Sequence, residues 1–317
     1  MRLAIALVLA FAAAASFDAA QQPPQPAPAP AQAEAVFSLE KYLSKHVTAK
    51  IIRRGRDAYA EHKTLLATVM AAYGVPSPTI VAIWGVESNF GHFSGVRPTI
   101  AALATLAWDP RRSAFFRGEL FDALTIVDHG DIDLSQLRGS WAGAMGQVQF
   151  MPSSYLQYAQ DFDHDGRRDI WSSPADVFAS IAYYLQAHGW KPGEPWGREV
   201  RVSKDVRKRI VMDVPRRNGT CVATRDMTTA LPLAEWKKLG VRAAGGAPLP
   251  VTGPSASLVS GSSRDFLVTG NYDALLAYNC AHSYALSVAM LADRIGATGR
   301  IAGEKAPAGK TARRHHG

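Results

Sequence analysis

The sequence has only two cysteines, and its N-terminal apolar run lacks both the length to cross a bilayer and a cysteine that a lipid could modify. That run extends from Leu3 to Phe11, whereas a membrane-spanning helix needs about 20 apolar residues. The chain also lacks an arginine-rich helix and an aromatic strand of the RNA-binding type, so nucleic acid is not the expected partner. These absences favour a protein without a membrane anchor.

The residues that are present indicate a folded protein with a basic surface. Hydrophobic residues make up 47% of the 317 residues, which is enough to build a full core and excludes disorder throughout the chain. The length fits one large domain, or a main domain with a smaller attachment. A net charge of +8 and a pI near 9.5 indicate attraction to an anionic partner, such as a membrane surface or a cell-wall polymer.

The composition divides the chain into four segments. Residues 1–20 have the positive charge, apolar run and small residues of a secretory signal peptide, which predicts a periplasmic protein that is soluble after export. Residues 21–36, rich in proline, alanine and glutamine, should form an extended linker. Residues 37–300 should form the folded domain, with a small β-containing lobe at about 191–270, and residues 301–317 should form a basic disordered tail.

A helix is predicted for the stretch SPTIVAIWGVESNFGHF. Its start is marked by Ser77, whose hydroxyl should cap the helix, and by the proline that follows. Ile80, Ile83 and Trp84 then form an apolar stripe at helical spacing, and the next position of that stripe is Glu87. The glutamate should therefore point inward, near the C-terminal end of the helix.

Two effects should favour the neutral form of Glu87. Burial disfavours its charge, and so does the negative pole of the helix macrodipole. A carboxylic acid that is protonated at neutral pH is what glycosidic bond cleavage needs as its general acid. The pattern alone also fits a glutamate that reaches solvent or pairs with an arginine, so other stretches must decide between these interpretations.

A glycine-rich stretch, GSWAGAMGQVQFMPSSY, extends from Gly139 to Tyr155. Its glycines permit close approach of the backbone and polar side chains lie between them, as in the wall of a groove for an extended ligand; tight helix packing is the alternative. Further upstream, Arg111 and Arg112 fall in the first turn of a helix predicted to open at Asp109. Cations are unfavourable there, which indicates an anionic neighbour, although solvated surface side chains are the alternative.

Five segments of the chain resemble, in this order, the lytic murein transglycosylase B family: GVESNFG, DPRRSAFF, GSWAGAMGQVQFMPSSY, DFDHDGRRDIW and YALSVAMLADRI. The resemblance extends from about Phe37 to Ile295. It implies a mainly α (α+β) fold, with a lysozyme-like helical core around a deep glycan groove and a small β-containing lobe. It also implies an enzyme that cleaves the β-1,4 bond between N-acetylmuramic acid and N-acetylglucosamine in peptidoglycan and leaves 1,6-anhydromuramoyl ends.

The same resemblance implies roles for individual residues, with peptidoglycan glycan strands as the partner. Glu87 would be the only catalytic carboxylate, first as acid on the leaving oxygen and then as base on the C6 hydroxyl of the muramoyl unit. This fits the residues themselves, because ordinary glycosidases need two carboxylates and the matched motifs supply one. The residues that would bind the glycan are Arg111, Arg112, Ser140, Gln149, Phe150, Tyr184, Tyr278, Asn279 and Tyr284. Each aromatic residue among them also suits a core position.

The stretch DFDHDGRRDIWSSPAD resembles the first half of a calcium-binding EF-hand loop. Asp161, Asp163 and Asp165 offer alternate oxygen ligands, and the glycine of the sharp turn and the carbonyl of Arg167 follow. A standard loop cannot close, because its twelfth position is a serine here. The resembling family uses a longer loop, which implies Asp176 as the last ligand; this aspartate also suits a helix cap. A structural Ca2+ is therefore a candidate ligand, and the chemistry needs no cofactor.

The two cysteines are expected to form a disulfide. Cys221 lies in the predicted β-containing lobe and Cys280 lies beside the predicted groove helix, and exported proteins keep such pairs oxidised. The bond would close the lobe onto that helix. Next to it, Ala281 stands where the family usually has a serine, which removes one expected groove contact.

Two other functions remain open from the sequence. One is a hydrolytic muramidase whose second carboxylate lies outside the recognised motifs. The other is a non-catalytic peptidoglycan-binding protein. Digestion of peptidoglycan distinguishes them from a lytic transglycosylase, because a hydrolase leaves reducing ends and a binding protein leaves no products.

Overall fold

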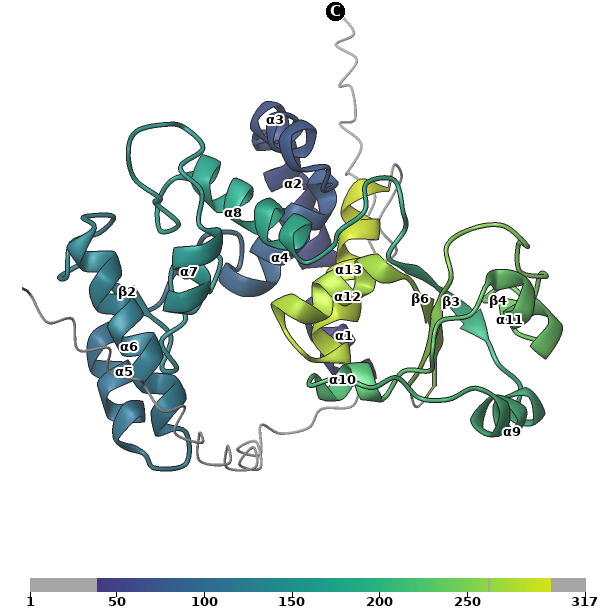
Figure 1. Cartoon of the computed structure of the whole chain (residues 1–317). Helices are drawn as coiled ribbons and strands as arrows, with labels where there is room; N and C mark the ends of the chain where they lie inside the picture. Colours follow the sequence, from purple (N-terminus) through teal and green to yellow (C-terminus); the bar gives the residue numbers. More distant parts are fainter. Residues whose placement is uncertain (1–38, 262, 298–317) are drawn as a thin grey trace, which may run out of the picture. The chain divides into compact units, whose positions relative to one another are not determined.

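The computed structural model describes residues 39–261 and 263–297 (Figure 1). The segments predicted as signal peptide, linker and tail, residues 1–20, 21–36 and 301–317, lie outside these ranges. Within them the chain is mainly helical, with small antiparallel sheets, which confirms the predicted α+β class.

The first part of the described chain consists of four helices. Thr48 caps the second of them, because its hydroxyl accepts a hydrogen bond of 3.2 Å from the Ile51 amide. Gly74 ends the third in a left-handed conformation (φ 71°), which favours glycine. The bounds are α1 (Leu39–His46), α2 (Ala49–Glu61), α3 (Lys63–Tyr73) and α4 (Ser77–Ser88).

The middle part of the chain adds four helices and a short ladder. The sequence predicted that Asp109 opens the second of these helices. Instead, Asp109 ends the first of them. Arg111 and Arg112 therefore lie in the connecting turn. The bounds are β1 (Arg97–Pro98), α5 (Thr99–Trp108), α6 (Ser113–Asp128), β2 (Arg138–Gly139), α7 (Pro152–Tyr158) and α8 (Pro174–Ala187).

The predicted β-containing lobe has an antiparallel sheet with the strand order β4-β3-β6-β5. Its strands are β3 (Gly197–Arg201), β4 (Arg242–Ala243), β5 (Ser257–Ser260) and β6 (Asp265–Val268). Its helices are α9 (Lys204–Asp213), α10 (Val222–Arg225) and α11 (Leu233–Leu239). The stretch PLAEWKKLG corresponds to α11 and its end at Gly240. The helix α9 is largely polar and α10 has only four residues, so neither shows a clear helical period in the sequence.

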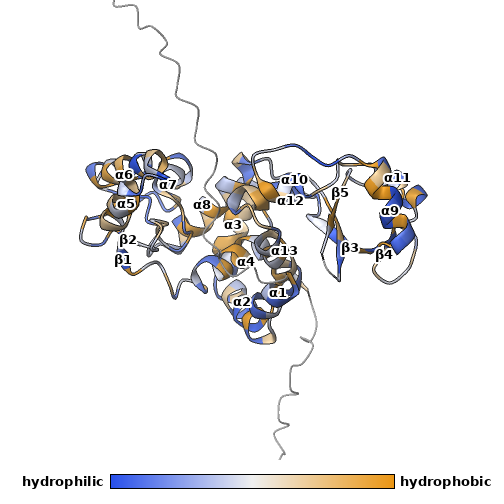
Figure 2. Cartoon of the chain, turned by 90° about the horizontal axis from the view of Figure 1, so that it is seen from below, coloured by the Kyte–Doolittle hydropathy of each residue, from blue (hydrophilic) through white to orange (hydrophobic). Residues whose placement is uncertain are grey.

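Two helices complete the described chain, and two hydrophobic clusters form its core. These helices are α12 (Gly270–Tyr278) and α13 (His282–Gly296). The larger cluster is built mainly from the helices outside the β-containing lobe, and Figure 2 shows hydrophobic stretches on α3, α4 and α8, which contact one another. The smaller cluster lies between the sheet and the helices α9 and α11, around the fully buried Trp236.

The helix α4 is buried on nearly all sides, not along one stripe as predicted. Ile80 and Ile83 are buried, but so are Val81 and Ala82 on its other faces, because α2, α8 and α13 all contact this helix. Its N-terminal cap also differs from the prediction. Pro76 is the cap residue, and the hydroxyl of Ser77 donates to the carbonyl of Leu66 instead (3.2 Å).

Within the described ranges no single helix is both long and apolar enough to cross a membrane. Two sharply bent pairs, α3 with α4 and α12 with α13, reach that length and composition only together.

Candidate active site

Glu87 lies in the last turn of α4, at the point where the helix is brought to an abrupt end. The next residues, Asn89 and Phe90, both have left-handed backbones (φ 54° and 59°), which side chains other than glycine rarely adopt. Such a conformation costs about 1–3 kcal/mol per residue unless the surroundings enforce it. Contacts of Phe90 and Asn89 with their neighbours must therefore stabilise this backbone conformation, which ends the helix that carries Glu87.

Phe90 and Asn89 are held by contacts from α2 and α4. The Phe90 ring packs so closely on Gly85 that a Cβ there would lie 2.6 Å from it. On the neighbouring helix, the Arg54 guanidinium donates to the Asn89 side-chain oxygen (2.6 Å) and carbonyl (3.1 Å). The same guanidinium lies 5.4 Å from the centre of the Phe90 ring. These contacts offset the strained backbone after Glu87.

The Glu87 side chain is only partly exposed, and burial raises its pKa to about 7 from the usual value of 4.5. An interaction with the hydroxyl of Tyr284 opposes this rise, because it favours the charged carboxylate. Within the described part of the chain that hydroxyl makes no hydrogen bond of normal length. It faces the carboxylate without a competing partner. Glu87 can therefore hold a proton near neutral pH and also release it.

Aromatic residues from three parts of the chain meet beside Glu87. The ring of Tyr278 lies 4.7 Å from that of Tyr184, 5.7 Å from that of Phe150 and 6.2 Å from that of Tyr284. The hydroxyl of Tyr278 donates to the Val148 carbonyl (2.7 Å), so it is already engaged. Burial and the Glu87 charge both raise the pKa of Tyr278 and of Tyr284, so these groups stay neutral.

The hydroxyl of Tyr184 is engaged as well, because it donates to the carbonyl of Ala277 (2.8 Å). Two of the three tyrosine hydroxyls thus donate to backbone carbonyls of other segments. Tyr284 alone presents its hydroxyl to Glu87. Phe150, Tyr184 and Tyr284 are all buried, so the core alternative that the sequence left open describes much of what these aromatics do.

Gln147 was not among the predicted site residues, yet it connects the helix of Glu87 to the glycine-rich stretch. Its amide oxygen accepts a hydrogen bond of 2.7 Å from the Trp84 indole, and its amide nitrogen donates to the Trp171 carbonyl (2.7 Å). The side chain is 9% exposed. A buried glutamine in a glycine-rich motif was the available signal, but nothing in the sequence identified its partners.

Ser140 and Gln149 shape the glycine-rich loop itself. The Ser140 hydroxyl accepts hydrogen bonds from the amides of Ala142 (3.3 Å) and Ala144 (3.1 Å). The Gln149 side chain donates to the carbonyl of Gly146 (2.8 Å). That glycine has φ 64°, and a Cβ there would lie 2.7 Å from the Ile170 carbonyl oxygen, so only glycine fits. Glycan contacts of these two polar residues stay a prediction.

Three carboxylates come together in the loop between α7 and α8. One oxygen each of Asp161, Asp163 and Asp176 lies within 4.8 Å of the others. Asp176 is fully buried and accepts hydrogen bonds of 2.8 Å from the amides of Phe162 and Asp169. Its pKa is raised to about 6, mainly by burial and further by the charges of Asp163 and Asp161. Such a crowded group of oxygens suits a hard divalent cation.

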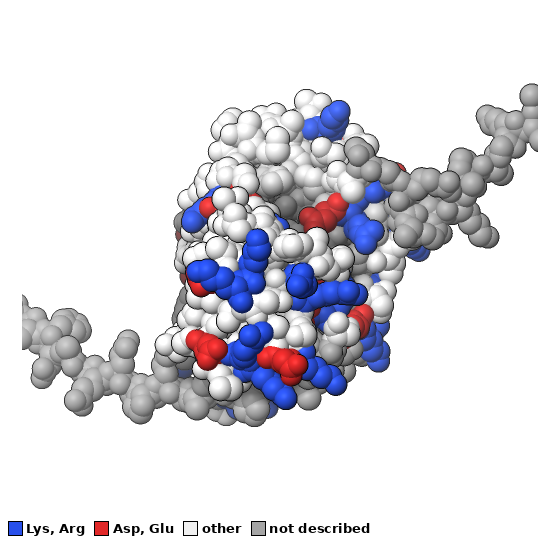
Figure 3. All heavy atoms as spheres, turned by 90° about the vertical axis from the view of Figure 1, so that its right-hand side faces the viewer, with Lys and Arg blue, Asp and Glu red and all other residues white. Residues whose placement is uncertain are grey.

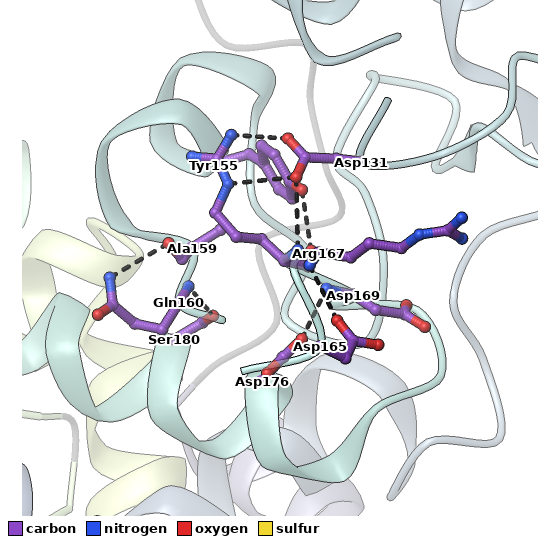
Figure 4. Close-up of polar contacts among 10 residues, drawn as sticks. Asp131, Tyr155, Ala159, Gln160, Asp165, Arg167, Asp169, Asp176 and Ser180 are labelled. Atoms are coloured by element: carbon purple, nitrogen blue, oxygen red, sulfur yellow. Dashed lines mark hydrogen bonds and ion pairs between the residues drawn. The ribbon is translucent and has the colours of Figure 1, made fainter. Parts of the chain in front are cut away.

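Arginines near this loop do not neutralise the three carboxylates. Arg168 forms an ion pair with Asp131 (2.6 Å), and Figure 4 shows Asp131 well apart from Asp176. Among the residues that the structure describes, none of the three carboxylates has an ion-pair partner. Asp165, a predicted ligand, lies outside the group, and its side chain accepts a hydrogen bond from the Arg167 amide (2.8 Å).

Comparison with known proteins assigns the chain to a family. Residues 11–293 match the family model described as Transglycosylase SLT domain. The chain belongs to this family. Its likeness to the membrane-bound lytic murein transglycosylase B of Escherichia coli is 41% identity over 155 residues, which cover 49% of this chain and 43% of that relative. The match therefore spans less than half of the relative's length.

Solved structures of lytic transglycosylases share the fold of this SLT-domain chain. SltB3 from Pseudomonas aeruginosa, in complex with NAG-anhNAM-pentapeptide, is 42% identical with a TM-score of 0.74, over 83% of this chain and 68% of that one. Slt35 from Escherichia coli, in complex with calcium, is 30% identical with a TM-score of 0.68, over 81% and 78% of the two chains. The predicted lysozyme-like core is thereby confirmed.

Three predicted glycan-binding residues of the SLT domain lie at exposed positions. Arg111 forms an ion pair with Asp109, and the guanidinium of Arg112 lies 4.9 Å from the ring centre of Phe116. Asn279 is exposed at the end of α12. Among the described residues, no hydrogen bond or ion pair joins these side chains to Glu87, so their contacts with the glycan stay a prediction.

A disulfide between Cys221 and Cys280 joins two parts of the SLT domain that are 59 residues apart in sequence. Cys221 immediately precedes α10, in the β-containing lobe. Cys280 lies between α12 and α13, two residues after Tyr278. The bond therefore restrains the connection between α12, which carries Tyr278, and α13, which carries Tyr284.

Proposed function

We propose that this SLT-domain protein is a peptidoglycan lytic transglycosylase in which Glu87 acts first as acid and then as base. The observation that carries the proposal is the partly exposed Glu87, whose pKa of about 7 leaves both of its protonation states accessible near neutral pH. The anhydro-sugar ligand of SltB3 supports the same product here. Digestion of purified peptidoglycan, followed by identification of the new glycan ends, tests the proposal.

In the first step, the protonated Glu87 gives its proton to the oxygen that leaves the muramoyl C1 as the glycosidic bond breaks. In the second step, the resulting carboxylate takes the proton of the C6 hydroxyl of the same muramoyl unit. The C6 oxygen then bonds to C1 and closes the 1,6-anhydro ring. Glu87 ends the cycle protonated, and no water is consumed.

The surroundings of Glu87 favour this route over hydrolysis. Ordinary glycosidases place a second carboxylate roughly 5–9.5 Å from the acid, as a nucleophile or as the base for water. Among the described residues, the side chain that interacts with Glu87 and affects its pKa is Tyr284, which is not a carboxylate. A C6 hydroxyl of the substrate can replace the missing nucleophile, because it reaches C1 from within the same sugar.

The remaining expectations belong to the same proposal. Glycan strands of peptidoglycan would bind along Phe150, Tyr278 and Tyr284, with Arg111 and Arg112 available for the carboxylates of the lactyl and peptide groups. The +8 charge and the predicted signal peptide support action in the periplasm, where this polymer lies.

Replacement of Tyr284 by phenylalanine should shift the alkaline limb of the activity profile to higher pH. The hydroxyl lowers the pKa of Glu87, so its removal lets that pKa rise above about 7 and keeps the acid protonated further into the alkaline range. The measurement is kcat/KM against pH. Tyr73→Phe is the matched control, because its hydroxyl donates to Gln160 instead and its loss should leave the limb in place. A limb that moves to lower pH would contradict the assigned role of Tyr284.

Ca2+ would be held by Asp161, Asp163 and Asp176, where it would supply positive charge to crowded carboxylates and tie the loop to α8. We expect Ca2+ to raise the melting temperature by roughly 5–10 °C at a concentration about 100 times its Kd, with little change in turnover. Asp176→Asn should abolish this rise, whereas Asp205→Asn in the β-containing lobe should retain it. Identical melting curves with Ca2+ and with chelator would refute the assignment.

A further inference from the structure

The β-containing lobe has a net charge nearly as large as that of the whole chain. Residues 197–269 contain thirteen Lys and Arg against six Asp and Glu, a difference of +7, whereas the whole chain has +8. Figure 3 views the molecule from the side where the sheet of this lobe, α9 and α11 lie in Figure 1, and Lys and Arg predominate on that face. This concentration of charge is unrelated to Glu87, which lies in another part of the fold.

Only part of this charge is neutralised within the lobe. Arg207 forms an ion pair with Asp265, Arg264 with Glu199, and Lys238 with Glu235. Eight further basic side chains of the lobe are exposed and have no ion-pair partner among the described residues. Arg209, Arg216 and Arg225 donate hydrogen bonds to backbone carbonyls. The other five are Arg201, Lys204, Lys208, Lys237 and Arg242.

Two of these arginines lie directly opposite each other. The ladder between β3 and β4 pairs Arg201 with Arg242. Like charges in such a cross-strand pair repel and destabilise the ladder. An anion outside the sheet would relieve this repulsion, so the pair indicates a surface that meets negative charge.

The helix α9 continues this basic surface and adds apolar side chains to it. Lys204, Lys208, Val211 and Met212 are spaced i, i+4, i+7 and i+8, so they share one face of the helix. Val211 is 70% exposed and Met212 is 81% exposed. The opposite face, with Val206 and Ile210, packs into the core of the lobe.

Lysines beside exposed apolar residues suit the boundary between lipid headgroups and acyl chains. The lysines would meet the anionic headgroups, while Val211 and Met212 would enter the apolar layer beneath them. A hydrophilic wall polymer would attract the lysines but would gain little from Val211 and Met212. The two kinds of side chain together therefore favour a bilayer.

We propose that the face formed by Arg201, Lys204, Lys208, Val211, Met212 and Arg242 adsorbs to a lipid bilayer that contains anionic headgroups. This attachment needs neither a membrane-spanning helix nor a lipid anchor. It would keep the enzyme next to the membrane while Glu87, elsewhere in the fold, remains available to its polymer.

Sedimentation of the whole mature chain with vesicles tests this surface. Vesicles of phosphatidylcholine with about one third phosphatidylglycerol should bind the protein, and vesicles of phosphatidylcholine alone should bind it far less. The double variant Lys204→Gln/Lys208→Gln should bind about 5-fold less for each lysine, roughly 30-fold in total. Binding by the unaltered chain should also fall as salt rises from about 0.15 M to about 1 M, since the Debye length shrinks from about 8 Å to about 3 Å.

Two further variants separate this surface from general charge attraction. Lys63→Gln/Arg117→Gln removes the same charge from exposed sites outside the lobe and should bind as the unaltered chain does. Val211→Ser/Met212→Ser keeps the charge and should nevertheless bind more weakly. Failure of the unaltered chain to bind anionic vesicles would overturn the proposal. An equal loss of vesicle binding in Lys204→Gln/Lys208→Gln and in Lys63→Gln/Arg117→Gln would also overturn it. Lysine-dependent binding to peptidoglycan without binding to vesicles would overturn it as well.

Discussion

Glu87→Gln should reduce turnover on peptidoglycan by about 1000-fold or more, because the amide can neither give the leaving oxygen a proton nor accept one from the C6 hydroxyl. General acid–base catalysis alone contributes about 10²–10⁴-fold, and here one residue supplies both halves of it. The measurement is the initial rate of product release at neutral pH. The binding of intact glycan should persist, since the isosteric side chain leaves the aromatic wall around Phe150 and Tyr278 in place.

The same variant should be more stable than the unaltered protein at alkaline pH. The pKa of Glu87 is raised to about 7 from 4.5, so the folded state holds its proton more tightly than the unfolded state. Stability is therefore lost as pH rises through this interval, whereas glutamine does not titrate. We expect a gain on the order of 1–2 kcal/mol at pH 8, after allowance for the partial exposure of the side chain, and almost none at pH 4. Thermal melting at both pH values checks that activity is lost without loss of the fold.

Loss of the disulfide should produce the largest change in stability. Cys221 and Cys280 are 59 residues apart, and opening a loop of that length costs about 4 kcal/mol in the chain-entropy account. We therefore expect Cys221→Ser/Cys280→Ser to melt about 10 °C lower than the oxidised protein. Turnover should fall less than in Glu87→Gln, because the bond restrains the connection after Tyr278 without contacting the reacting atoms.

Mass spectrometry of the oxidised protein, with and without reduction, provides the control for this result. The oxidised chain should be lighter than the reduced one by two hydrogens and should show no free thiol. Reductant should lower the melting temperature of the unaltered protein to that of the serine variant. Two free thiols in protein isolated from an oxidising compartment would contradict the pairing.

Much of the fold could be predicted because local signals agreed with the tertiary structure. Gly74 and Asn89 end α3 and α4 in left-handed conformations directly after apolar runs, and glycine or asparagine at such a position is a strong stop signal in a sequence. The strands β5 and β6 followed their short apolar runs. By contrast, α9 was missed because only Val206 and Ile210 face a core and lysines and arginines occupy most of the rest.

The proposed catalytic residue could be selected from the sequence, but the contacts that support it could not. Glu87 was identified from its motif, yet the predicted one-sided stripe was wrong because neighbours enclose α4 from several directions. The hydrogen bonds from Trp84 to Gln147 and from Arg54 to Asn89 join residues that are distant in sequence. Such pairings depend on the packing of whole helices, which no local pattern reports.

The chemical structure of the new glycan ends tests most directly whether Glu87 acts as acid and base without a second catalytic carboxylate. Purified peptidoglycan digested by the mature protein should release fragments with 1,6-anhydromuramoyl ends, each lighter by one water than its hydrolytic counterpart and resistant to borohydride reduction. Glu87→Gln should release almost none. Fragments with reducing ends that borohydride converts to the alcohol would contradict the account, because they would require an activated water and a second catalytic group.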